Sequence, residues 1–579
     1  MRKILLLLLS TLTVLLSFSQ GTYIPLGSQS YQILDRLDIK YSKILPVLHT
    51  TDKGYYRGDA ANTAETLLLS NLRFNKVVNY QLQYLVDENP DFLDSLQSRT
   101  KKPLWKFYRE PASFLHYSSK KKGLFDFRLN PVFDLKVGVE SFDKRFIFSS
   151  VRGLEVRGNI KRVFSFYFNV LGNAARPPKF VSDKIIANAK FNQYAYVPGQ
   201  AYWKDYSSKI FKFNDGIDYF DARGYINVNV LKYINLSFGR DKFFIGNGMR
   251  SMFLSDFSAP YLFLKFNLKV WRIDYQSIFA ELNSQYIRGA DQLLPKKYMA
   301  VHHLSIQAAH WLNVGLFEGV IMKRSNHFEL QYLNPIIFYR AVEHSIGSPD
   351  NVLIGGDYKI NLFNHLQIYG QVLFDEFNFK HAFKGDGWWA NKWALQVGLK
   401  YIDLVPNLDA QIEANIARPF TYTHEADVNY TNYNQPLAHP LGANFYEVIF
   451  QLQYQPLPKL YLKAKYMAAV VGDDTLDATT GLLTNFGGDI LTSSGGGSSV
   501  TREFGNKIGQ GAKANINYFQ FMLSYSPWHN IYVDLDMFYR SKSGKLSADN
   551  PSAGNLYYQS TFFFGVGLRM NIGAKTYDF

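Results

Sequence analysis

The chain of 579 residues contains no cysteine. This absence excludes disulfide bonds, zinc sites with thiolate ligands and thiol nucleophiles. Long apolar runs are also missing: beyond the first twenty residues, no stretch reaches the roughly eighteen apolar residues expected of a transmembrane helix. The motifs G-x-S-x-G and H-E-x-x-H do not occur, and the 12 histidines show no metal-ligand spacing. We therefore expect a protein that is not an enzyme and that has no cofactor or metal.

Aromatic residues are abundant, with 47 Phe and 40 Tyr, and the mean hydropathy is −0.17 although 47% of the residues are hydrophobic. The stretch from Phe562 to Ile572 alternates: every residue of one strand face is apolar, whereas Arg569 and Asn571 fall on the other face. This pattern is typical of a membrane β-barrel, whose apolar face meets lipid and whose polar face lines the lumen. A secreted β-propeller or sandwich would also alternate, and it is the alternative.

The formal net charge is +15, with lysine and arginine dispersed along the polar strand faces and the loops. Dispersed positive charge favours a solvated lumen and attraction to anionic lipid head groups or acidic polysaccharide, and it disfavours a nucleic-acid partner. We expect outer-membrane lipid and lipopolysaccharide to be partners, and no nucleic acid.

Residues 1–19 have the pattern of a secretory signal peptide. Arg2 and Lys3 form the charged start, an apolar core follows, and small residues precede the expected cleavage between Ser19 and Gln20. Export of this kind fits the outer membrane of a Gram-negative bacterium.

Residues 20–115 are expected to form a small α-helical domain. Ser30, Asp59 and Asn75 are good helix-starting residues, and each precedes a stretch with helical periodicity. Asn89-Pro90 has the pattern of another helix start.

Residues 116–579 are expected to form the barrel, an all-β transmembrane fold of about eighteen antiparallel strands, each near the ~9–11 residues that cross a bilayer at a tilt. The predicted strands are 133–141, 146–158, 161–171, 219–230, 232–240, 261–270, 271–282, 299–309, 311–323, 353–361, 365–378, 392–402, 406–418, 443–455, 458–469, 514–526, 530–540 and 558–572. Strand 558–572 is expected to close the barrel against strand 133–141.

The connections between these strands alternate between short and long, except that connection 142–145 is short and yet falls on the outer side. In outer-membrane barrels the short turns face the periplasm and the long loops face outward, which places the helical domain at the periplasmic mouth. Loop 241–260 is expected to fold into the lumen. Loop 470–513 is rich in glycine and serine and is expected to be a mobile surface loop.

Four loop stretches combine aromatic rings with planar polar side chains, a combination that suits sugar recognition. The candidate glycan-binding or loop-organising residues are Arg240, Arg250, Asn334, Tyr339, Arg340, Glu343, Trp388, Trp389, Trp393, Asn434, Gln435, His439 and Asn444. The alternative is that the tryptophans anchor the barrel at the lipid interface and that the polar groups hold the loops together.

The same loops carry the motifs GRDKFFIGNGMRSMFLSDFSAPYLFLK, YLNPIIFYR, GWWANKWALQVGLKY and NYNQPLAHPLGANFYE. In this order they resemble the Wzi-type capsule assembly family, and more closely its Bacteroidetes branch, which includes the gliding-motility protein RemB. The resemblance implies an eighteen-stranded outer-membrane barrel with a periplasmic helical bundle. It also implies a role in holding exported polysaccharide at the cell surface, or in surface motility and adhesion.

Three functions are carried forward from the sequence. The first is capsule or exopolysaccharide assembly, with surface polysaccharide bound or anchored through extracellular loops. The second is a gliding-motility or adhesion accessory, and the third is a diffusion porin.

The chain ends in Phe579, which looks like the terminal aromatic residue favoured by the barrel-assembly machinery. Tyr577 and Phe579 lie on the opposite parity from Phe562 to Ile572. A bulge near Gly573 is therefore needed if they are to face lipid with the rest.

Overall fold

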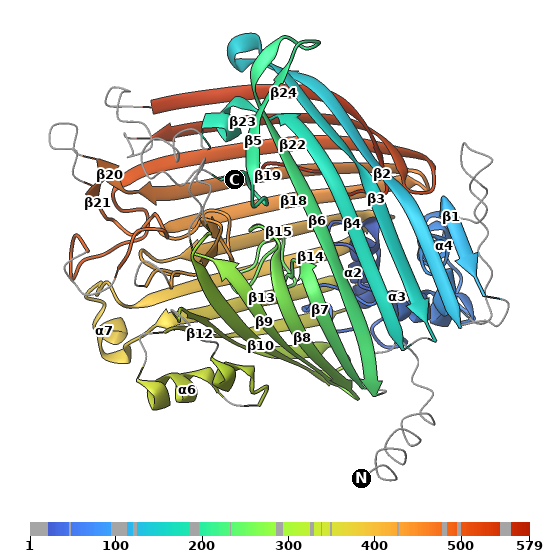
Figure 1. The fold of residues 1–579 in the computed structure, drawn as a ribbon, viewed down its shortest axis with the longest axis horizontal. Helices are drawn as coiled ribbons and strands as arrows, with labels where there is room; N and C mark the ends of the chain where they lie inside the picture. The colour runs from blue at the N-terminus through green and yellow to red at the C-terminus, as the bar shows by residue number, and fades with distance from the viewer. Residues whose placement is uncertain are drawn as a thin grey trace.

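The computed structural model shows a closed antiparallel β-barrel of 18 strands with N-terminal helices at one end (Figure 1). The structure describes residues 21–45, 48–93, 113–119, 124–161, 163–183, 185, 196–231, 233–284, 293–324, 329–336, 338–347, 350–424, 428–476, 483–494, 500–544 and 557–579. The predicted signal peptide, with Ser19 and Gln20, lies outside these residues. None of the helices in the described part is long and apolar enough to cross a membrane.

All the predicted barrel strands are confirmed, most with ends that differ by a few residues. They are β2 (Phe125–Glu140), β3 (Phe146–Ile160), β4 (Phe164–Arg176), β6 (Phe213–Leu231), β7 (Ile234–Asp241), β8 (Tyr261–Val270), β9 (Ile273–Asn283), β10 (Lys296–Ala309), β11 (Leu312–Met322), β12 (Asn351–Leu362), β13 (Leu366–Glu376), β14 (Lys392–Val405), β15 (Leu408–Ala417), β18 (Phe445–Leu457), β19 (Leu460–Asp473), β22 (Ala512–Trp528), β23 (Ile531–Gly544) and β24 (Tyr557–Met570).

Short accessory elements lie on the loops. Two further strands join the same sheet: β1 (Leu115–Ser118) pairs with the first half of β2, and β5 (Trp203–Ser208) pairs with β6. Two small hairpins are formed by β16 (Thr431–Asn432) with β17 (Gln435–Pro436) and by β20 (Thr475–Leu476) with β21 (Leu483–Thr484). Helical segments on the loops include η2 (Phe142–Lys144), η3 (Leu330–Leu333), α6 (Tyr339–Ile346) and α7 (Phe379–Lys384), and residues 179–183 are helical as well.

The barrel closes between its first and last strands, as expected. β24 pairs with β2 from Met570 opposite Phe133 to Phe563 opposite Glu140. On β24 the apolar residues of one face are exposed, and Arg569 on the other face forms an ion pair of 2.6 Å with Asp534 inside the barrel. The alternation in the sequence therefore separates a lipid-facing side from a lumen side.

The two ends of the barrel differ in the lengths of their connections. At one end, neighbouring strands are joined by tight turns, and several turns carry exposed aromatic rings, among them Trp271 (80% exposed) and Phe363 (82% exposed). Aromatic residues at this level are typical of the membrane interface. We assign the short-turn end to the periplasm and the long-loop end to the outside, by the rule for outer-membrane barrels.

The N-terminal domain contains α2 (Gln29–Tyr41), α3 (Arg57–Leu68), α4 (Lys76–Glu88) and η1 (Pro90–Phe92). Asn75 caps α4 as predicted, because its side chain accepts a hydrogen bond of 2.8 Å from the amide of Val78. Ser28 caps α2, two residues before the expected Ser30. Asp59 is not a cap: α3 begins at Arg57, which leaves Asp59 in the first turn of the helix. The last described helical turn of this domain, η1, ends at Phe92.

The helical domain docks in the short-turn mouth, onto side chains that face the lumen. Arg36 on α2 forms ion pairs with Asp403 and Asp409, next to the turn between β14 and β15. On the other side of the mouth, Glu88 at the end of α4 accepts a hydrogen bond of 2.7 Å from His529, in the turn between β22 and β23. These contacts confirm that the helices lie at the mouth and tie them to opposite parts of the barrel wall.

Asp35 on α2 makes this docking sensitive to pH. Its carboxylate lies 3.1 Å from Lys53 and 3.2 Å from Lys400 on β14. Burial by itself would raise the pKa of Asp35, but the two lysines outweigh burial and lower it to about 2. Because the folded pKa is below the unfolded value of about 3.9, the stabilisation is present above pH ~4 and is lost as the pH falls toward ~2.

We therefore expect Asp35→Asn to reduce the free energy of unfolding by about 2 kcal/mol at pH 6. Urea titrations at pH 6 and near pH 2 on both proteins test this expectation. The difference between wild type and variant should shrink toward zero near pH 2. An equal difference at both pH values would contradict the assigned role of Asp35.

Candidate functional site

Residues 242–258, between β7 and β8, form an inward loop that fills the middle of the lumen, as the sequence predicted. The loop meets the helical domain through the amide of Lys53, which donates to the carbonyl of Phe244 at 2.9 Å, and the amide of Gly246, which donates to the carbonyl of Thr51 at 2.7 Å. On its outward side, the amide of Ser255 donates to the carbonyl of Leu437 at 2.7 Å. The inward loop thus connects the periplasmic helices to an extracellular loop.

The glycine-rich turn of the inward loop binds a carboxylate of the barrel wall. The amides of Met249 and Arg250 donate to Glu413 on β15, at 2.7 and 3.0 Å. A side chain at Gly248 would collide with this carboxylate, because a Cβ placed there would lie 2.4 Å from Glu413. The turn therefore holds an internal carboxylate, and glycine at position 248 is needed for the close approach.

Arg250 is the hub of the lumen. Its guanidinium lies 3.2 Å from Glu447 on β18 and 3.1 Å from Asp578, and it donates to the backbone carbonyl of Asp578 at 2.6 Å. Burial alone would lower the pKa of Arg250, but Asp578 and Glu447 raise it above its usual value. Lys465 also pairs with Asp578 at 2.7 Å, and the two cations hold the pKa of Asp578 well below its usual range against the effect of burial.

His439 joins this hub as a neutral group. Its Nε2 lies 2.9 Å from Glu447, and its Nδ1 accepts a hydrogen bond of 3.1 Å from the amide of Leu441. An unprotonated Nδ1 means that Nε2 carries the proton and donates it to Glu447. Burial lowers the pKa of His439, in agreement with this tautomer. His439 therefore organises a loop and is not open to a ligand.

The C-terminal residues turn into the lumen. Phe579 is 5% exposed and packs edge-on against Phe180 and Phe257, with ring centroids 6.4 and 5.6 Å away. Phe579 therefore does not face lipid, because the chain leaves the wall after Met570 and Asp578 pairs with two cations inside the barrel. Whether Phe579 also serves as an assembly signal stays a prediction.

Three more predicted site residues are buried and hold loops together. Gln435 accepts from the amide of Gly199 and donates to the carbonyl of Gln200, both at 2.7 Å. Asn444 donates to the carbonyl of Gly472 at 2.7 Å and accepts from the amide of Gly509 at the same distance. Asn434 adopts a φ of 61° in the turn of the hairpin formed by β16 and β17. For these residues the loop-organising alternative is the correct interpretation.

Two predicted residues point away from the lumen. Arg240 and Trp393 lie on β7 and β14, at positions that alternate with lumen-facing residues such as Asp241 and Lys392. Four others, Asn334, Tyr339, Arg340 and Glu343, belong to a loop that lies against the outside of the wall, beside β11 (Figure 1). The predicted residues therefore do not form one site.

Trp388 and Trp389 remain as candidates for contact with an external ligand. Trp388 stacks on His381 of α7, with ring centroids 4.7 Å apart, and Phe504 lies 5.8 Å from the same His381 ring. Asp386 orients both neighbours: it accepts from the amide of Trp388 at 3.1 Å and pairs with Nδ1 of His381 at 2.7 Å. We call these residues, His381, Asp386, Trp388, Trp389 and Phe504, the outer platform.

The outer platform is built from two long loops that are joined by main-chain bonds. Gly505 and Asn506 donate their amides to the carbonyls of Asp386 and Gly387, at 2.8 and 3.0 Å, and the amide of Trp389 donates to the carbonyl of Glu503 at 3.0 Å. Phe504 is 44% exposed and Trp388 is half-buried. Exposed ring faces beside a carboxylate and an imidazole can stack on sugar rings and bond their hydroxyls.

Residues 484–494, a described part of the loop between β19 and β22, are more closely packed than the sequence suggested. Ile490 and Ser494 are buried, and Ser494 accepts from Lys392 on β14 at 3.3 Å. The prediction of a surface loop is therefore wrong for residues 483–494, which fold over the mouth of the barrel. Its glycine-rich part, 495–499, lies outside the described residues.

A cavity of about 730 Å³ lies between the helical domain, the inward loop and the barrel wall. It is lined by charged groups of both signs, including Asp35, Lys53, Arg223, Lys242, Lys463 and Lys575. Burial is the main cause that lowers the pKa of Lys242 to about 7, and the positive charge of the nearby Arg223 adds to it. The cavity is a polar compartment on the periplasmic side of the Arg250 hub.

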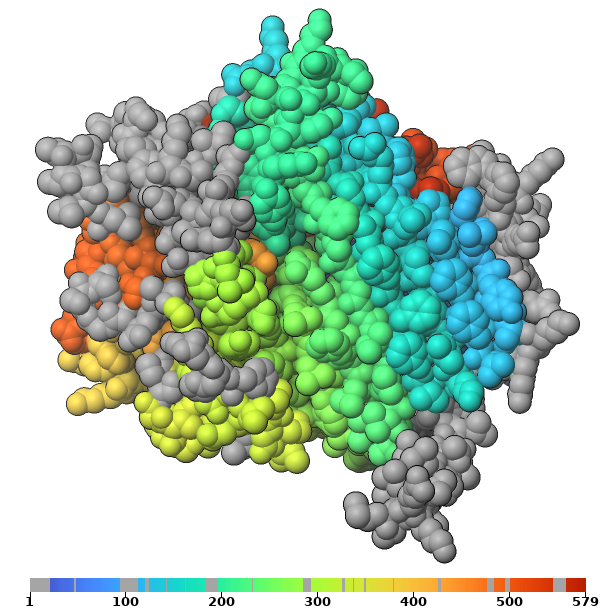
Figure 2. Space-filling model, in the orientation of Figure 1, coloured from blue at the N-terminus to red at the C-terminus, as the bar shows by residue number. Residues whose placement is uncertain are grey.

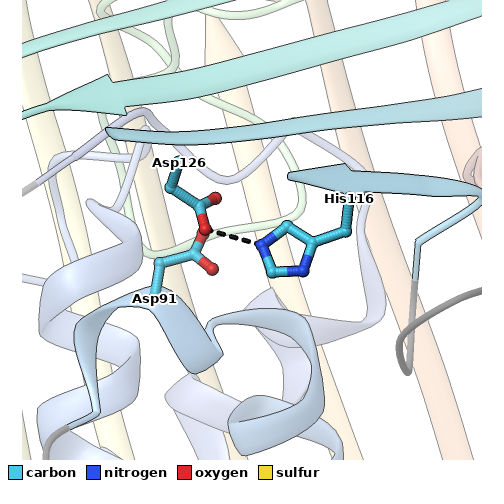
Figure 3. Close-up of side chains that lie close together, drawn as sticks. All are labelled: Asp91, His116 and Asp126. Atoms are coloured by element: carbon cyan, nitrogen blue, oxygen red, sulfur yellow. Dashed lines mark hydrogen bonds and ion pairs between the residues drawn. The ribbon is translucent and has the colours of Figure 1, made fainter. Parts of the chain in front are cut away.

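Asp91, His116 and Asp126 come close enough to be considered as metal ligands. They point toward one another from η1, β1 and β2 (Figure 3), and each offers a ligand atom within 4.8 Å of the others. His116 and Asp126 are paired at 2.6 Å, and Arg128 forms ion pairs with both carboxylates. Because a guanidinium already balances the two carboxylates, the cluster is best explained as a tie between η1 and the β1–β2 hairpin.

Several residues of the lumen hub and the outer platform are not predicted from the sequence. Glu413 and Glu447 could be recognised as lumen-facing from the alternation of their strands, but nothing in the sequence pairs them with Arg250. Asp578 lies between Tyr577 and Phe579, and nothing in this short segment predicts that its carboxylate faces the lumen. No sequence motif predicts the contacts among His381, Asp386 and Phe504, because their proximity depends on how two long loops fold.

No protein-family model and no curated protein matches this sequence. Among solved structures, the chain is similar to Wzi of Escherichia coli, described as a carbohydrate-binding β-barrel of the outer membrane involved in group 1 capsule assembly. The two are 10% identical, the match covers 96% of this chain and 99% of Wzi, and the TM-score is 0.56.

Weaker likenesses link the chain to Pseudomonas aeruginosa OprD (12% identity, 77% and 95% coverage, TM-score 0.39) and to Acinetobacter baumannii OccAB2 (7% identity, 76% and 97% coverage, TM-score 0.40). At 10% identity, the likeness to Wzi shows a shared fold. The chain has the closed 18-stranded outer-membrane barrel with N-terminal helices, and it is similar in structure to Wzi over nearly its whole length.

Proposed function

We propose that this protein is a non-enzymatic outer-membrane barrel that holds surface polysaccharide through its extracellular loops, in a role like capsule assembly. The observation that carries the proposal is the outer platform, where Trp388 and Phe504 present aromatic faces at the long-loop end. The likeness to Wzi supports it, since that protein is described as carbohydrate-binding.

A filled lumen favours this role over that of a diffusion porin. The inward loop contacts many parts of the wall: Phe253 stacks on Phe317 of β11 at 4.4 Å, Gln371 of β13 accepts from the amide of Met252 at 2.8 Å, and Arg250 reaches β18. A barrel that anchors a polymer at its outer face does not need an open channel, whereas a porin does.

Trp388→Ala is expected to weaken binding of surface polysaccharide about five- to tenfold, because one aromatic contact is worth about 1 kcal/mol. The measurement is binding of polysaccharide from the producing cells to the purified barrel in detergent. Trp271→Ala is the matched control, since Trp271 is exposed on a periplasmic turn. Equal affinity of wild type and Trp388→Ala, with both barrels folded, would count against the outer platform as the binding site.

A further inference from the structure

The loop between β11 and β12 does not project outward; it folds back along the outside of the barrel. We call its described residues 329–336 and 338–347, which include η3 and α6, the outer cover. Phe317 on β11 faces the lumen, where it stacks on Phe253, so the neighbouring Leu316 and Glu318 face outward. Glu318 accepts hydrogen bonds from the amides of Tyr339 and Arg340, at 2.8 and 3.0 Å. The first turn of α6 is thus tied to the outer wall.

The outer cover satisfies further polar groups that the wall presents on its outer face. The hydroxyl of Tyr275 on β9 lies 2.7 Å from Nδ1 of His302 on β10, and it also bonds to the carbonyl of Pro335 in the cover. The ring of Tyr339 packs edge-on against His302, with centroids 3.8 Å apart. Polar groups on a lipid-facing wall are costly unless they are paired, and here the cover pairs them.

Apolar packing completes this contact. On the wall, Phe279 and Val320 are buried although their strand positions face outward; on the cover, Tyr332, Tyr339 and Val342 are buried against them. On β24, by contrast, the outward residues Phe564 and Val566 are 43% and 47% exposed. The outer cover therefore takes the place of lipid over β9 to β12, and Figure 2 shows this yellow-green part of the chain seated on the outside of the molecule.

The position of Glu318 places the cover at membrane depth. From the turn residue Trp311 to Glu318 the strand advances seven residues, which is about 23 Å along a tilted strand or about 17 Å in height. The apolar band of such barrels is about 25 Å tall. The attachment point of α6 therefore lies inside the band.

The free side of the cover carries three large apolar side chains, next to exposed polar residues such as Gln331 and Asn334. Ile336 is 89% exposed, Phe338 75% and Leu330 69%. The cover is tied to the wall at Glu318, which pairs with the exposed Ile354 and lies two residues from the exposed Leu316, within the lipid-facing band. Large exposed apolar side chains that continue an apolar surface mark an interaction site.

We propose that the outer cover is inserted into the outer leaflet of the membrane and that Leu330, Ile336 and Phe338 contact lipid acyl chains. The proposal depends on the orientation of the barrel in the membrane and not on polysaccharide binding. The cover would give this barrel a loop-borne contact with lipid, beyond the strand faces themselves.

The absence of cysteine from the chain makes the test direct, because a single introduced cysteine carries the only spin label. The protein is labelled in lipid vesicles as Ile336→Cys or Phe338→Cys, and collisions of the label with oxygen and with a water-soluble nickel chelate are measured. Leu316→Cys on the wall is the lipid control, and Lys209→Cys at the exposed tip of the β5–β6 hairpin is the water control.

We expect both cover labels to collide preferentially with oxygen, as the Leu316→Cys label does. Preferential collision with the nickel chelate at either position, as at Lys209→Cys, would overturn the proposal. Both positions are highly exposed, so labelling should leave the fold intact. Resistance of the barrel to unfolding by sodium dodecyl sulfate in unheated samples checks this for each variant. A failed Trp388→Ala experiment would leave this result unaffected.

Discussion

Replacing Arg250 with methionine is expected to reduce the free energy of unfolding by about 3–5 kcal/mol, because removing one partner of a buried ion pair leaves the others uncompensated. Glu447 and Asp578 would both lose their guanidinium, and Glu447 is fully enclosed. Methionine keeps most of the volume of the side chain, so the loss reports the charge more than the packing. Urea unfolding in lipid vesicles, followed by tryptophan fluorescence, measures the effect.

Lys296→Met is the matched control for this experiment. Lys296 forms an ion pair of 2.8 Å with Glu281 at the long-loop end of β10, and its side chain is 37% exposed. Pairs of this kind contribute only about 0–1 kcal/mol. If Arg250→Met were no more destabilising than Lys296→Met, Arg250 would not be the hub of the lumen.

The same Arg250→Met variant should also change conductance in planar bilayers. Wild type is expected to show little steady current, because the inward loop and the C-terminal residues meet at Arg250. Loss of the hub should free the inward loop and produce frequent channel openings. A large and steady current from wild type would contradict the filled lumen and would favour the porin hypothesis.

Phe579→Ala is expected to destabilise the folded barrel by about 3–5 kcal/mol, the usual cost of removing a buried phenylalanine ring. The ring packs against Phe180 and Phe257, and the carbonyl of Phe579 accepts from Arg540 at 3.2 Å. The measurement is again the free energy of unfolding, made on protein refolded into vesicles. Refolding from urea separates stability from assembly in the cell.

Phe562→Ala is the control, since Phe562 lies on the lipid-facing side of β24 and is 47% exposed. We expect a smaller loss for Phe562→Ala than for Phe579→Ala. If Phe579→Ala refolds with unchanged stability but fails to insert in cells, the terminal aromatic acts only as an assembly signal and its packing in the lumen contributes nothing.

The sequence predicts the barrel well because every strand must separate lipid from lumen. Alternation at positions such as Val566 and Leu568 against Arg569 is therefore visible without any knowledge of neighbours. The first half of β2 is not predicted, although Phe125, Phe127 and Leu129 alternate there with polar residues. The ion pairs of Arg128 with Asp91 and Asp126, which tie this half to the helical domain, depend on the fold and are not visible in the sequence.

The loops were harder to interpret, because burial inside a lumen and contact with a sugar call for similar residues. Gln435, His439 and Asn444 have the planar polar groups of a glycan site, yet they satisfy main-chain and side-chain groups of this chain. Trp388, by contrast, is an aromatic residue that stays half-buried at the surface of the long loops. Pairings such as Arg250 with Asp578, 328 residues apart, depend on the closed barrel and leave no local trace in the sequence.

The most direct test of the proposed function is retention of surface polysaccharide by cells. A strain that lacks this protein is complemented with wild type, Trp388→Ala or Trp271→Ala, and cell-bound and released polysaccharide are measured together with spreading on a surface. We predict that wild type and Trp271→Ala restore cell-bound polysaccharide and that Trp388→Ala releases more of it into the medium. Normal retention in the strain without the protein, with impaired spreading, would contradict the polysaccharide role and favour the motility hypothesis.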